Sequence, residues 1–303
     1  MPANVSRTVA VLGSLNLDFV LNIPRMPEAG ETLASERSAT FCGGKGANQA
    51  VACARMGASV AMIGRVGDDP AGLMLRTALK EEGIIVDGVV PTEGVATGAA
   101  AILLTPDGQN RIVIAAGANG RLDAADVVAQ RARIDTASLL VCQLEVPLET
   151  VSAAVARAAA AKVPVLLNPA PALLLPAELL DGVDYLIPNE SEASILTGVD
   201  VHDVPSATRA AAILRAQGVA CVIVTLGAAG ILIADDRGTR HLPAMPAEVV
   251  DTTAAGDSFI GGFAAGLVEG LDTDEAASLG LRAARICVGR EGAQASLPRR
   301  SEI

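Results

Sequence analysis

Asp251-Thr252-Thr253-Ala254-Ala255-Gly256-Asp257-Ser258-Phe259 joins a strand-like stretch, residues 247–250, to an apolar helical pattern. The small residues at 254–256 allow the backbone to turn tightly into a helix N-terminus. Unpaired N–H groups and the helix dipole at such a terminus favour an anion. The segment therefore predicts a binding place for a phosphoryl group in transit.

Asp257 falls in the first turn of that predicted helix. A carboxylate there can take a proton from an attacking hydroxyl while the N–H groups stabilise the transferred phosphoryl group. Alternatively Asp257 only caps the helix, as acidic residues in a first turn often do. The segment by itself leaves both interpretations open.

A glycine-rich segment, Gly43-Gly44-Lys45-Gly46-Ala47-Asn48-Gln49, precedes another helical pattern. Its glycines allow a polar ligand to approach the backbone closely, and Asn48 offers an amide for hydroxyl recognition. It is not a Walker A loop, because Gly46 stands where Ser or Thr should follow Lys45. The alternative is a flexible turn with a solvated lysine.

Polar residues also follow the predicted strands. Asn16 and Asp18 come after the first strand, at the carboxyl end where open α/β sheets bind ligands, and they share one face of an extended segment. An amide beside a carboxylate can bind the vicinal hydroxyls of a sugar, although each residue alone is typical of a turn. Other residues in this position are Glu145, Asn189, Glu192 and the segment 225–230. An Asn-x-x-Glu that opens a helix can also hold Mg²⁺ through water.

Short β-branched runs alternate with longer Ala-rich stretches along the chain. We expect strands at 8–12, 59–63, 139–142, 164–167, 185–187 and 220–225, and helices at 45–56, 71–82, 148–161, 207–217, 255–269 and 273–289. Four glycines stand where helix C-caps are expected: Gly57, Gly83, Gly218 and Gly270. The alternation predicts an α/β fold with a mostly parallel sheet covered on both faces.

Two regions break this alternation. Residues 19–41 read as a few antiparallel strands that leave the main sheet, and residues 98–115 read as a hairpin around Pro106-Asp107-Gly108. Such pieces commonly form lids or interfaces. Nothing in the sequence marks a second independent domain.

The composition restricts the class of protein. Of the 303 residues, 51% are hydrophobic and 19% are charged, which predicts a globular chain with a sizeable core. No stretch approaches the roughly 18 apolar residues of a membrane span, and the N-terminus lacks a secretory pattern, so we expect a cytoplasmic protein without a membrane partner.

Charge and cysteine content exclude further classes. A formal charge of -11 argues against a nucleic-acid partner but not against a mononucleotide, which backbone N–H groups can hold. Five scattered cysteines indicate neither a disulfide framework nor a zinc site. Two histidines offer little material for a His-based centre.

Together, the segments 43–48 and 251–257 resemble the two signatures of the ribokinase-like, phosphofructokinase-B type carbohydrate kinases. The segments 189–192 and 225–230 match intermediate motifs of that family in order and spacing. The resemblance extends from Val9 to Pro298. Within the family the match is with members that phosphorylate ribose, at 13–18, 43–52, 143–145 and 168–171.

The resemblance implies a three-layer α/β/α fold with a small β-sheet lid, formed mainly by 15–42 and 98–115, in a single kinase domain. The lid would close over the sugar and pair with the lid of a second subunit in a homodimer. The implied reaction is transfer of the γ-phosphoryl group of MgATP to the 5-hydroxyl of D-ribose, which gives ribose 5-phosphate and ADP.

The resemblance also implies roles for individual residues. Asp257 would be the catalytic base, with an anion hole formed by Ala254, Ala255 and Gly256. Ribose would contact Asn16, Asp18, Gly44, Lys45, Gly46, Asn48, Glu145 and Asp257. ATP would lie against Asn189, Thr225, Leu226, Gly227, Ala228, Ala229, Gly230 and Gly256, with Mg²⁺ held through water by Asn189 and Glu192. A K⁺ site would use Asp251, Thr253, Cys287, Arg290, Gly292 and Ser296.

Some alternatives stay open. Leu281 stands where these kinases often have a histidine near the adenine, which puts that contact in doubt. The substrate could instead be fructose, 2-keto-3-deoxygluconate or a nucleoside, although the scarcity of aromatic residues disfavours base stacking. A Rossmann dehydrogenase is disfavoured because no G-x-G-x-x-G follows the first strand. A non-catalytic sugar-binding protein is disfavoured by the intact Gly256-Asp257 pair.

Overall fold

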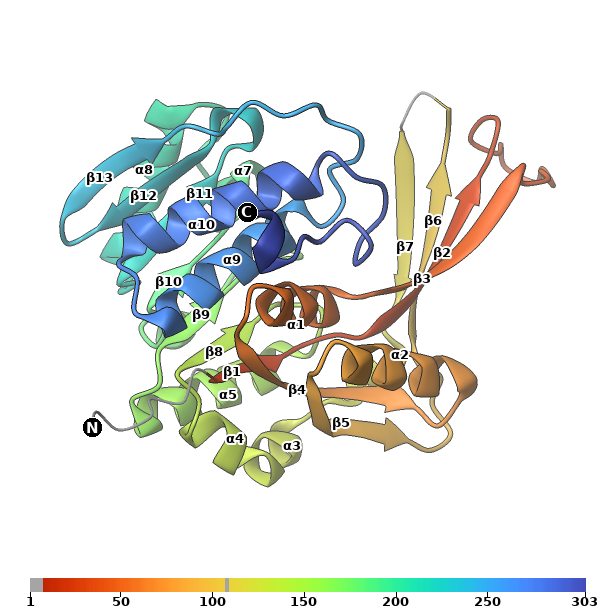
Figure 1. Cartoon of the computed structure of the whole chain (residues 1–303), viewed down its shortest axis with the longest axis horizontal. Coiled ribbons are helices and arrows are strands. Elements are labelled where there is room, and N and C mark those ends of the chain that lie inside the picture. Colours follow the sequence, from red (N-terminus) through yellow and green to blue (C-terminus); the bar gives the residue numbers. More distant parts are fainter. Residues whose placement is uncertain (1–7, 107–108) are drawn as a thin grey trace.

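A computed structural model describes residues 8–106 and 109–303. Seven described strands run parallel in the main sheet: β1 (Thr8–Leu12), β4 (Ser59–Gly67), β5 (Ile85–Thr92), β8 (Leu139–Cys142), β9 (Val165–Leu167), β10 (Tyr185–Leu186) and β11 (Cys221–Thr225). The antiparallel strands β12 (Ile231–Asp235) and β13 (Gly238–Leu242) extend it at one edge. The strand order is β13-β12-β11-β10-β9-β8-β1-β4-β5 (Figure 1).

Helices cover both faces of this sheet, and alternate residues of β1 show why. Val9 and Val11 pack into one core, whereas Ala10 and Leu12 pack into the other, and all four are fully buried. Helices α1 (Lys45–Arg55), α2 (Pro70–Glu81), α9 (Ala255–Glu269) and α10 (Thr273–Cys287) contribute to the first core. The second core contains α3 (Ala124–Ala129), α4 (Arg131–Asp135), α5 (Leu148–Ala161), α6 (Ala177–Leu180), α7 (Glu190–Thr197) and α8 (Val204–Ala216). The predicted three-layer α/β/α fold is confirmed.

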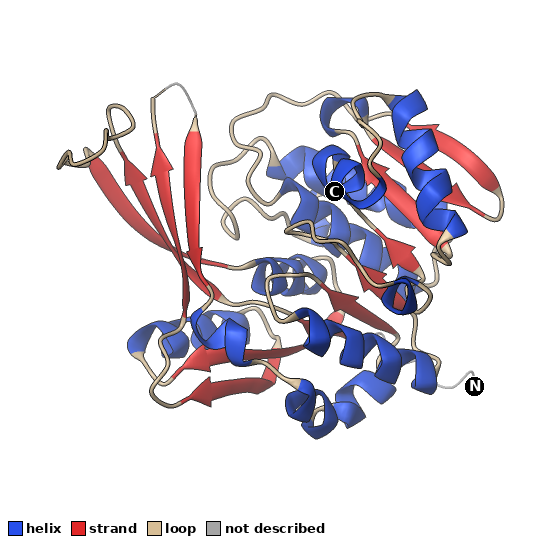
Figure 2. Ribbon diagram, turned by 180° about the vertical axis from the view of Figure 1, so that it is seen from behind, coloured by secondary structure: helices blue, strands red, loops and turns tan. Residues whose placement is uncertain are grey.

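A smaller sheet projects from one side of the molecule (Figures 1 and 2). It contains β2 (Asn16–Asn22), β3 (Arg37–Gly43), β6 (Gly98–Leu104) and β7 (Asn110–Ala115) in the order β3-β2-β6-β7. The antiparallel pairs β2–β3 and β6–β7 correspond to the two predicted excursions, and β2 and β6 join them in parallel. Of the predicted turn at 106–108, residues 107 and 108 lie outside the described residues.

Some elements differ from the sequence prediction. Residues 247–250 form no strand, because the Val250 N–H donates to the carbonyl of Val288, at the end of α10, over 2.8 Å rather than to a sheet. Strand β5 was not predicted, since Gly88 and Pro91 interrupt its pattern, and Pro91 is tolerated because β5 is an edge strand. The hairpin β12–β13 was also not predicted. The four expected helix-ending glycines all adopt positive φ, which confirms the C-caps.

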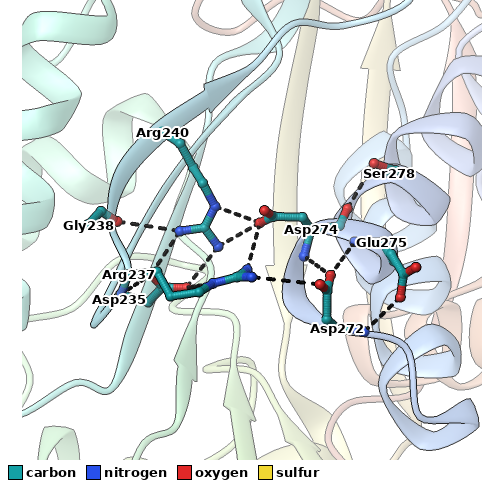
Figure 3. A network of polar contacts seen from close by, with 8 residues as sticks. All are labelled: Asp235, Arg237, Gly238, Arg240, Asp272, Asp274, Glu275 and Ser278. Carbon is teal, nitrogen blue, oxygen red and sulfur yellow. Dashed lines mark hydrogen bonds and ion pairs between the residues drawn. The ribbon is translucent and has the colours of Figure 1, made fainter.

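Ion pairs fasten the β12–β13 hairpin to the start of α10 (Figure 3). The Arg240 guanidinium donates to Asp235 at 2.8 Å and to Asp274 at 2.6 Å. Arg237 lies 3.6 Å from Asp272, which caps α10 by accepting the N–H of Glu275 at 2.9 Å. The network therefore fixes α10 relative to the sheet edge, and α10 packs along α9.

Within the described residues, no helix combines the length and the apolar character needed to cross a membrane.

Candidate active site

A cavity of about 200 Å³ lies where the carboxyl ends of β9, β10 and β11 meet the start of α9. The predicted site residues that line it are Lys45, Asn189, Glu192, Thr225, Ala254, Ala255, Gly256 and Asp257. Side chains predicted from four separate segments of the chain are thus brought together at one edge of the parallel sheet, as open α/β sheets commonly do.

The backbone turns sharply into α9 at Ala254, which has φ 60° and ψ 10°. This left-handed conformation costs a non-glycine residue about 1–2 kcal/mol. The turn is closed by the Ala255 N–H, which donates to the Thr252 carbonyl at 3.2 Å. A side chain at Gly256 would meet no neighbouring atom within 4 Å, so open space lies above the first turn. Ala254, Ala255 and Gly256 line the cavity, and the first N–H groups of a helix lack intrahelical acceptors.

Asp257 is buried, with 7% of its surface exposed. Its Oδ2 accepts from Asn48 Nδ2 at 3.1 Å, and its Oδ1 accepts from Gln49 Nε2 at 2.9 Å. Both donors belong to α1, so the interpretation of Asp257 as only a cap of its own helix is wrong. Burial raises the pKa of Asp257, while Lys45 and the two amides oppose that rise.

Lys45 is not a solvated lysine. Burial lowers its pKa, but the nearby carboxylates of Asp257, Glu145 and Glu192 outweigh that effect and raise it. Its backbone N–H donates to Glu145 Oε2 at 3.0 Å, and the Ser14 hydroxyl donates to the same oxygen at 2.6 Å. Glu145 therefore joins the start of α1 to the end of β1, and Lys45 is the cation among three acids.

Asn16 and Asp18 lie at the root of the small sheet. Asn16 is buried, and its Oδ1 accepts from Asn119 Nδ2 at 2.7 Å. That bond leaves the Asn16 NH₂ group as the donor available to a ligand. Burial, with a smaller contribution from the charge of Glu145, raises the pKa of Asp18 to about 7.

The glycines beside these residues serve close packing. A Cβ atom at Gly43 would lie 2.0 Å from Asp18 Oδ2, and Gly44 has φ 89°. The Gly46 N–H donates to Ser14 Oγ at 3.3 Å, and a Cβ there would lie 2.5 Å from the Ser14 nitrogen. Gly46, predicted to bind the substrate, therefore packs α1 against the end of β1.

The segment after β11 forms a tight turn. Gly227 and Gly230 have positive φ, and the Gly230 N–H donates to the Gly227 carbonyl at 3.1 Å. Leu226 is buried in the core, so only its backbone is available to a ligand, whereas Ala228 and Ala229 are exposed. Thr225 lines the cavity.

Asn189 and Glu192 form a reciprocal capping box at the start of α7. Asn189 Oδ1 accepts the Glu192 N–H at 2.8 Å, and Glu192 Oε2 accepts the Asn189 N–H at 2.9 Å. Burial raises the pKa of Glu192. Both residues line the cavity and present oxygen atoms, the ligand type that Mg²⁺ prefers.

The predicted K⁺ residues gather behind the α9 turn. Asp251 accepts the N–H groups of Thr253 at 2.8 Å and Gly292 at 2.9 Å. Burial raises its pKa, but these hydrogen bonds outweigh burial and lower it. Cys287 Sγ lies 3.6 Å from the Thr253 carbonyl and 3.1 Å from Ser296 Oγ.

Arg290 differs from the other predicted K⁺ residues in where its side chain lies. Its guanidinium donates to Glu302 at 2.5 Å, so this residue could serve a cation only through its backbone. Among the described residues no cluster of three His, Cys, Asp or Glu side chains suits a metal ion. The carboxylate and carbonyl oxygens nearby fit a hard monovalent cation.

Sequence reasoning gave no role to five polar residues that support the site. They are Ser14, Gln49, Asn119, Gln143 and Asn168. Four of them, all except Asn119, lie inside the segments that carried the family resemblance, but their partners are distant in sequence. Leu281, in contrast, packs partly buried against the core on the α10 side.

Comparisons with known proteins agree with this geometry. The model of the pfkB family of carbohydrate kinases matches residues 6–300. A ribokinase of Haemophilus influenzae is 43% identical over 98% of this chain and 97% of its own length. A ribokinase of Schizosaccharomyces pombe is 40% identical over 97% of this chain and 96% of its own.

Solved structures show the same likeness. The structure of Arabidopsis thaliana ribokinase complexed with ribose and ATP superposes with a TM-score of 0.92 at 34% identity, covering 97% of this chain and 96% of that one. Thermotoga maritima ribokinase gives a TM-score of 0.89 at 36% identity, with 97% of both chains covered. From the matched family model and these relatives, the chain belongs to the pfkB family of carbohydrate kinases.

Proposed function

We propose that this chain transfers the γ-phosphoryl group of MgATP to the 5-hydroxyl of D-ribose. The observation that carries the proposal is the buried Asp257 carboxylate in the cavity at the start of α9, directly beside the amide of Asn48. The similarity to ribokinases, one of them complexed with ribose and ATP, supports ribose as the acceptor.

The sugar would lie between α1 and the root of the small sheet. Asn48 Oδ1 is buried without a hydrogen-bond partner among the described atoms, which is costly unless a ligand supplies a donor. A sugar hydroxyl is such a donor. Asn16 would donate to the sugar, while Asp18 and Glu145 would accept from its other hydroxyls, with the backbones of Gly44 and Lys45 close by.

Asp257 would act as the general base. Its raised pKa brings the carboxylate nearer to the operating pH, where a base transfers protons most effectively. As the hydroxyl attacks, its proton would pass to an Asp257 oxygen. The N–H groups of residues 254–256 and the Lys45 ammonium would stabilise the charge on the phosphoryl oxygens.

The nucleotide would lie against the turn after β11, near Thr225, Gly227 and Gly230, with its terminal phosphate at the α9 N-terminus. Asn189 and Glu192 would hold Mg²⁺ through water. When bound, that ion neutralises charge on the phosphates. The Mg²⁺ assignment is supported by the position of these two oxygen-bearing residues in the lining of the cavity.

A monovalent cation would bind next to the α9 turn. Its ligands would be Asp251 and backbone carbonyls of Thr253, Cys287, Arg290 and Gly292, with Ser296 nearby. When bound, the cation would fix the conformation of the turn without contacting the sugar. The hydrogen bond from Gly292 to Asp251, which joins the two segments, supports this assignment.

We also propose that the small sheet is a lid over the sugar and that it pairs with a second copy of the chain. Large apolar side chains on this sheet are exposed: Phe19, Phe41, Ile112, Val113 and Ile114. By the strand register, Phe19 and Val113 lie in one row and Phe41 and Ile114 in the next, so apolar side chains stand on both faces of the sheet. Exposed apolar surface favours association. A Val113→Lys variant that sediments as a monomer beside a dimeric parent would support the pairing.

The cytoplasm is the proposed location of the protein. All five cysteines are free thiols, which suits that compartment.

Coupled measurement of ADP release over a panel of acceptors tests the function. D-ribose should give the highest kcat/KM among ribose, fructose, 2-keto-3-deoxygluconate and nucleosides. A higher value for another acceptor would reassign the substrate within the family. Tight ribose binding without ADP release would instead indicate a non-catalytic sugar-binding protein.

A further inference from the structure

Gln49 lies one residue after Asn48 on α1, and its side chain is completely buried. Its Nε2 donates to Asp257 Oδ1 at 2.9 Å and to Asn168 Oδ1 at 3.1 Å. Its Oε1 accepts from Gln143 Nε2 at 2.6 Å. Both amide protons of Gln49 are therefore in use, and one of them is on the carboxylate.

The direction of these hydrogen bonds is determined by a backbone group. Asn168 Nδ2 donates to the Ile187 carbonyl at 3.0 Å, and a carbonyl can only accept. Asn168 must then turn its Oδ1 towards Gln49, and Gln49 must turn its NH₂ group towards Asn168 and Asp257. The side-chain oxygen of Gln49, Oε1, then faces Gln143 and accepts from its Nε2.

We infer that Gln49 is a positioning residue for phosphoryl transfer, which holds the Asp257 carboxylate in the plane that meets the acceptor hydroxyl. The inference rests on the proposed function. Asn48 and Gln49 each bind a different oxygen of Asp257, so together they fix the rotation of the carboxylate. Each oxygen keeps further lone-pair capacity for the hydroxyl proton.

Loss of the Gln49 donor should change both geometry and proton affinity. With one bond remaining, the carboxylate can rotate, and misplacement by about 1 Å can cost on the order of a hundredfold in rate. The charged and titratable groups around Asp257 are Lys45, Glu145, Glu192 and Cys287. None of these is altered when Gln49 is replaced. Because an amide donor favours the ionised form, its removal should raise the pKa of Asp257.

The test is Gln49→Met, which keeps the length of the side chain and removes both donors. We expect kcat to fall roughly 10- to 100-fold while the KM values for ribose and MgATP change by less than about threefold. The ascending limb of the pH profile of kcat/KM should move to higher pH. Gln130→Met is the matched control, since the Gln130 amide contacts Arg133, between α3 and α4.

Two results would overturn the inference. One is a kcat and a pH limb that match the parent. The other is a parallel loss of kcat and ribose binding with an unmoved pH limb, which indicates a purely structural role. If Gln49→Met does not fold, Gln49→Leu decides, because it removes the same donors: the fall in kcat and the shift of the limb are then required of that variant.

Asp257→Asn, assayed in parallel, separates this inference from the proposed function. Near-normal turnover of Asp257→Asn would remove the base itself. An inactive Asp257→Asn beside an unaffected Gln49→Met would overturn only the role of Gln49.

Discussion

Asn48 Nδ2 donates to Asp257 Oδ2 at 3.1 Å, although 209 residues separate the two in the sequence. Asn48 belongs to α1, which follows the small sheet, and Asp257 belongs to α9, at the proposed phosphoryl-binding turn. One hydrogen bond therefore joins the proposed sugar side of the site to the proposed nucleotide side.

Asp257→Asn should retain binding of ribose and ATP but lower kcat by roughly 10² to 10⁴, the usual loss when a general base is removed. The isosteric amide keeps the shape of the side chain and cannot accept the hydroxyl proton. Steady-state kinetics with calorimetric binding would measure both effects. The control is Asp87→Asn, at an exposed carboxylate, and turnover of Asp257→Asn close to the parent rate would exclude the base role.

Asp18→Ala should weaken ribose much more than ATP. A hydrogen bond to a charged group is worth about 1.5–3 kcal/mol, so the Kd for ribose should rise roughly 10- to 100-fold. Calorimetric titration of each ligand separately measures this selectivity. Equal losses for both ligands would point to a folding role for Asp18.

Asp18 should also make stability depend on pH. Its pKa is about 7 in the folded chain, against 3.8 for an unperturbed aspartate carboxyl. Between these values the unfolded chain binds fewer protons, so the contribution of Asp18 to stability falls as pH rises and is fully lost above the folded pKa. The neutral Asp18→Asn variant should therefore gain in Tm relative to the parent between about pH 5 and about pH 8.

Differential scanning calorimetry at both pH values measures that gain. Asp236→Asn removes the same charge at an exposed position and serves as the control. A Tm difference between Asp18→Asn and its parent that stays constant with pH would show that Asp18 titrates normally.

Most of the fold could be predicted because most helices and strands are marked by local sequence patterns. Helices α5 and α9 were predicted with the bounds observed, since Pro147 precedes one and Gly270 ends the other. The prediction of a strand at 247–250 was wrong. A β-branched run has the same sequence pattern whether its N–H groups pair with a strand or, as at Val250, with the carbonyl of Val288.

The site divides in a similar way. Asp257 and Asn48 could be found from short motifs. The small residues before Asp257 indicate an anion-binding helix start, and the glycines before Asn48 indicate close approach of a ligand. The roles of Gln49 and Gln143 could not, because their amides meet across 94 residues and each looks like an ordinary buried glutamine until its partner is placed. The same holds for Asn119, whose contact with Asn16 spans 103 residues.

Close packing of α1 on α9 brings Asp257 to its amide partners, and Gly261→Ala should disturb it. A Cβ at Gly261 would lie 2.2 Å from the Ala52 Cβ and 2.7 Å from the Ala52 carbonyl carbon. We expect a loss of stability of about 1–3 kcal/mol from overpacking, together with reduced kcat. Ala52→Gly should rescue only part of this loss, because the backbone contact remains.

Urea denaturation of the single and double variants measures these changes. Gly120→Ala is the control, since a Cβ there would meet its nearest neighbour at 3.5 Å, an ordinary contact. A Gly261→Ala chain as stable as the control would mean that α1 and α9 can separate without cost.

K⁺ should activate the enzyme more than Na⁺ does. Asp251 holds the loop at Gly292 and the turn at Thr253 through its two carboxylate oxygens, and this turn leads directly into the strained Ala254. Carbonyl oxygens from two such segments can replace the hydration shell of a large monovalent ion. An ion there would set the positions of the N–H groups at 254–256, where errors of about 1 Å can cost on the order of a hundredfold in rate. The effect should therefore appear mainly in kcat, since the ion would contact no substrate.

Initial rates at saturating MgATP and ribose, with K⁺ exchanged for Na⁺ at constant ionic strength, measure this activation. Asp251→Ala should abolish the difference between the two ions, and equal rates of the parent enzyme in both would refute cation activation.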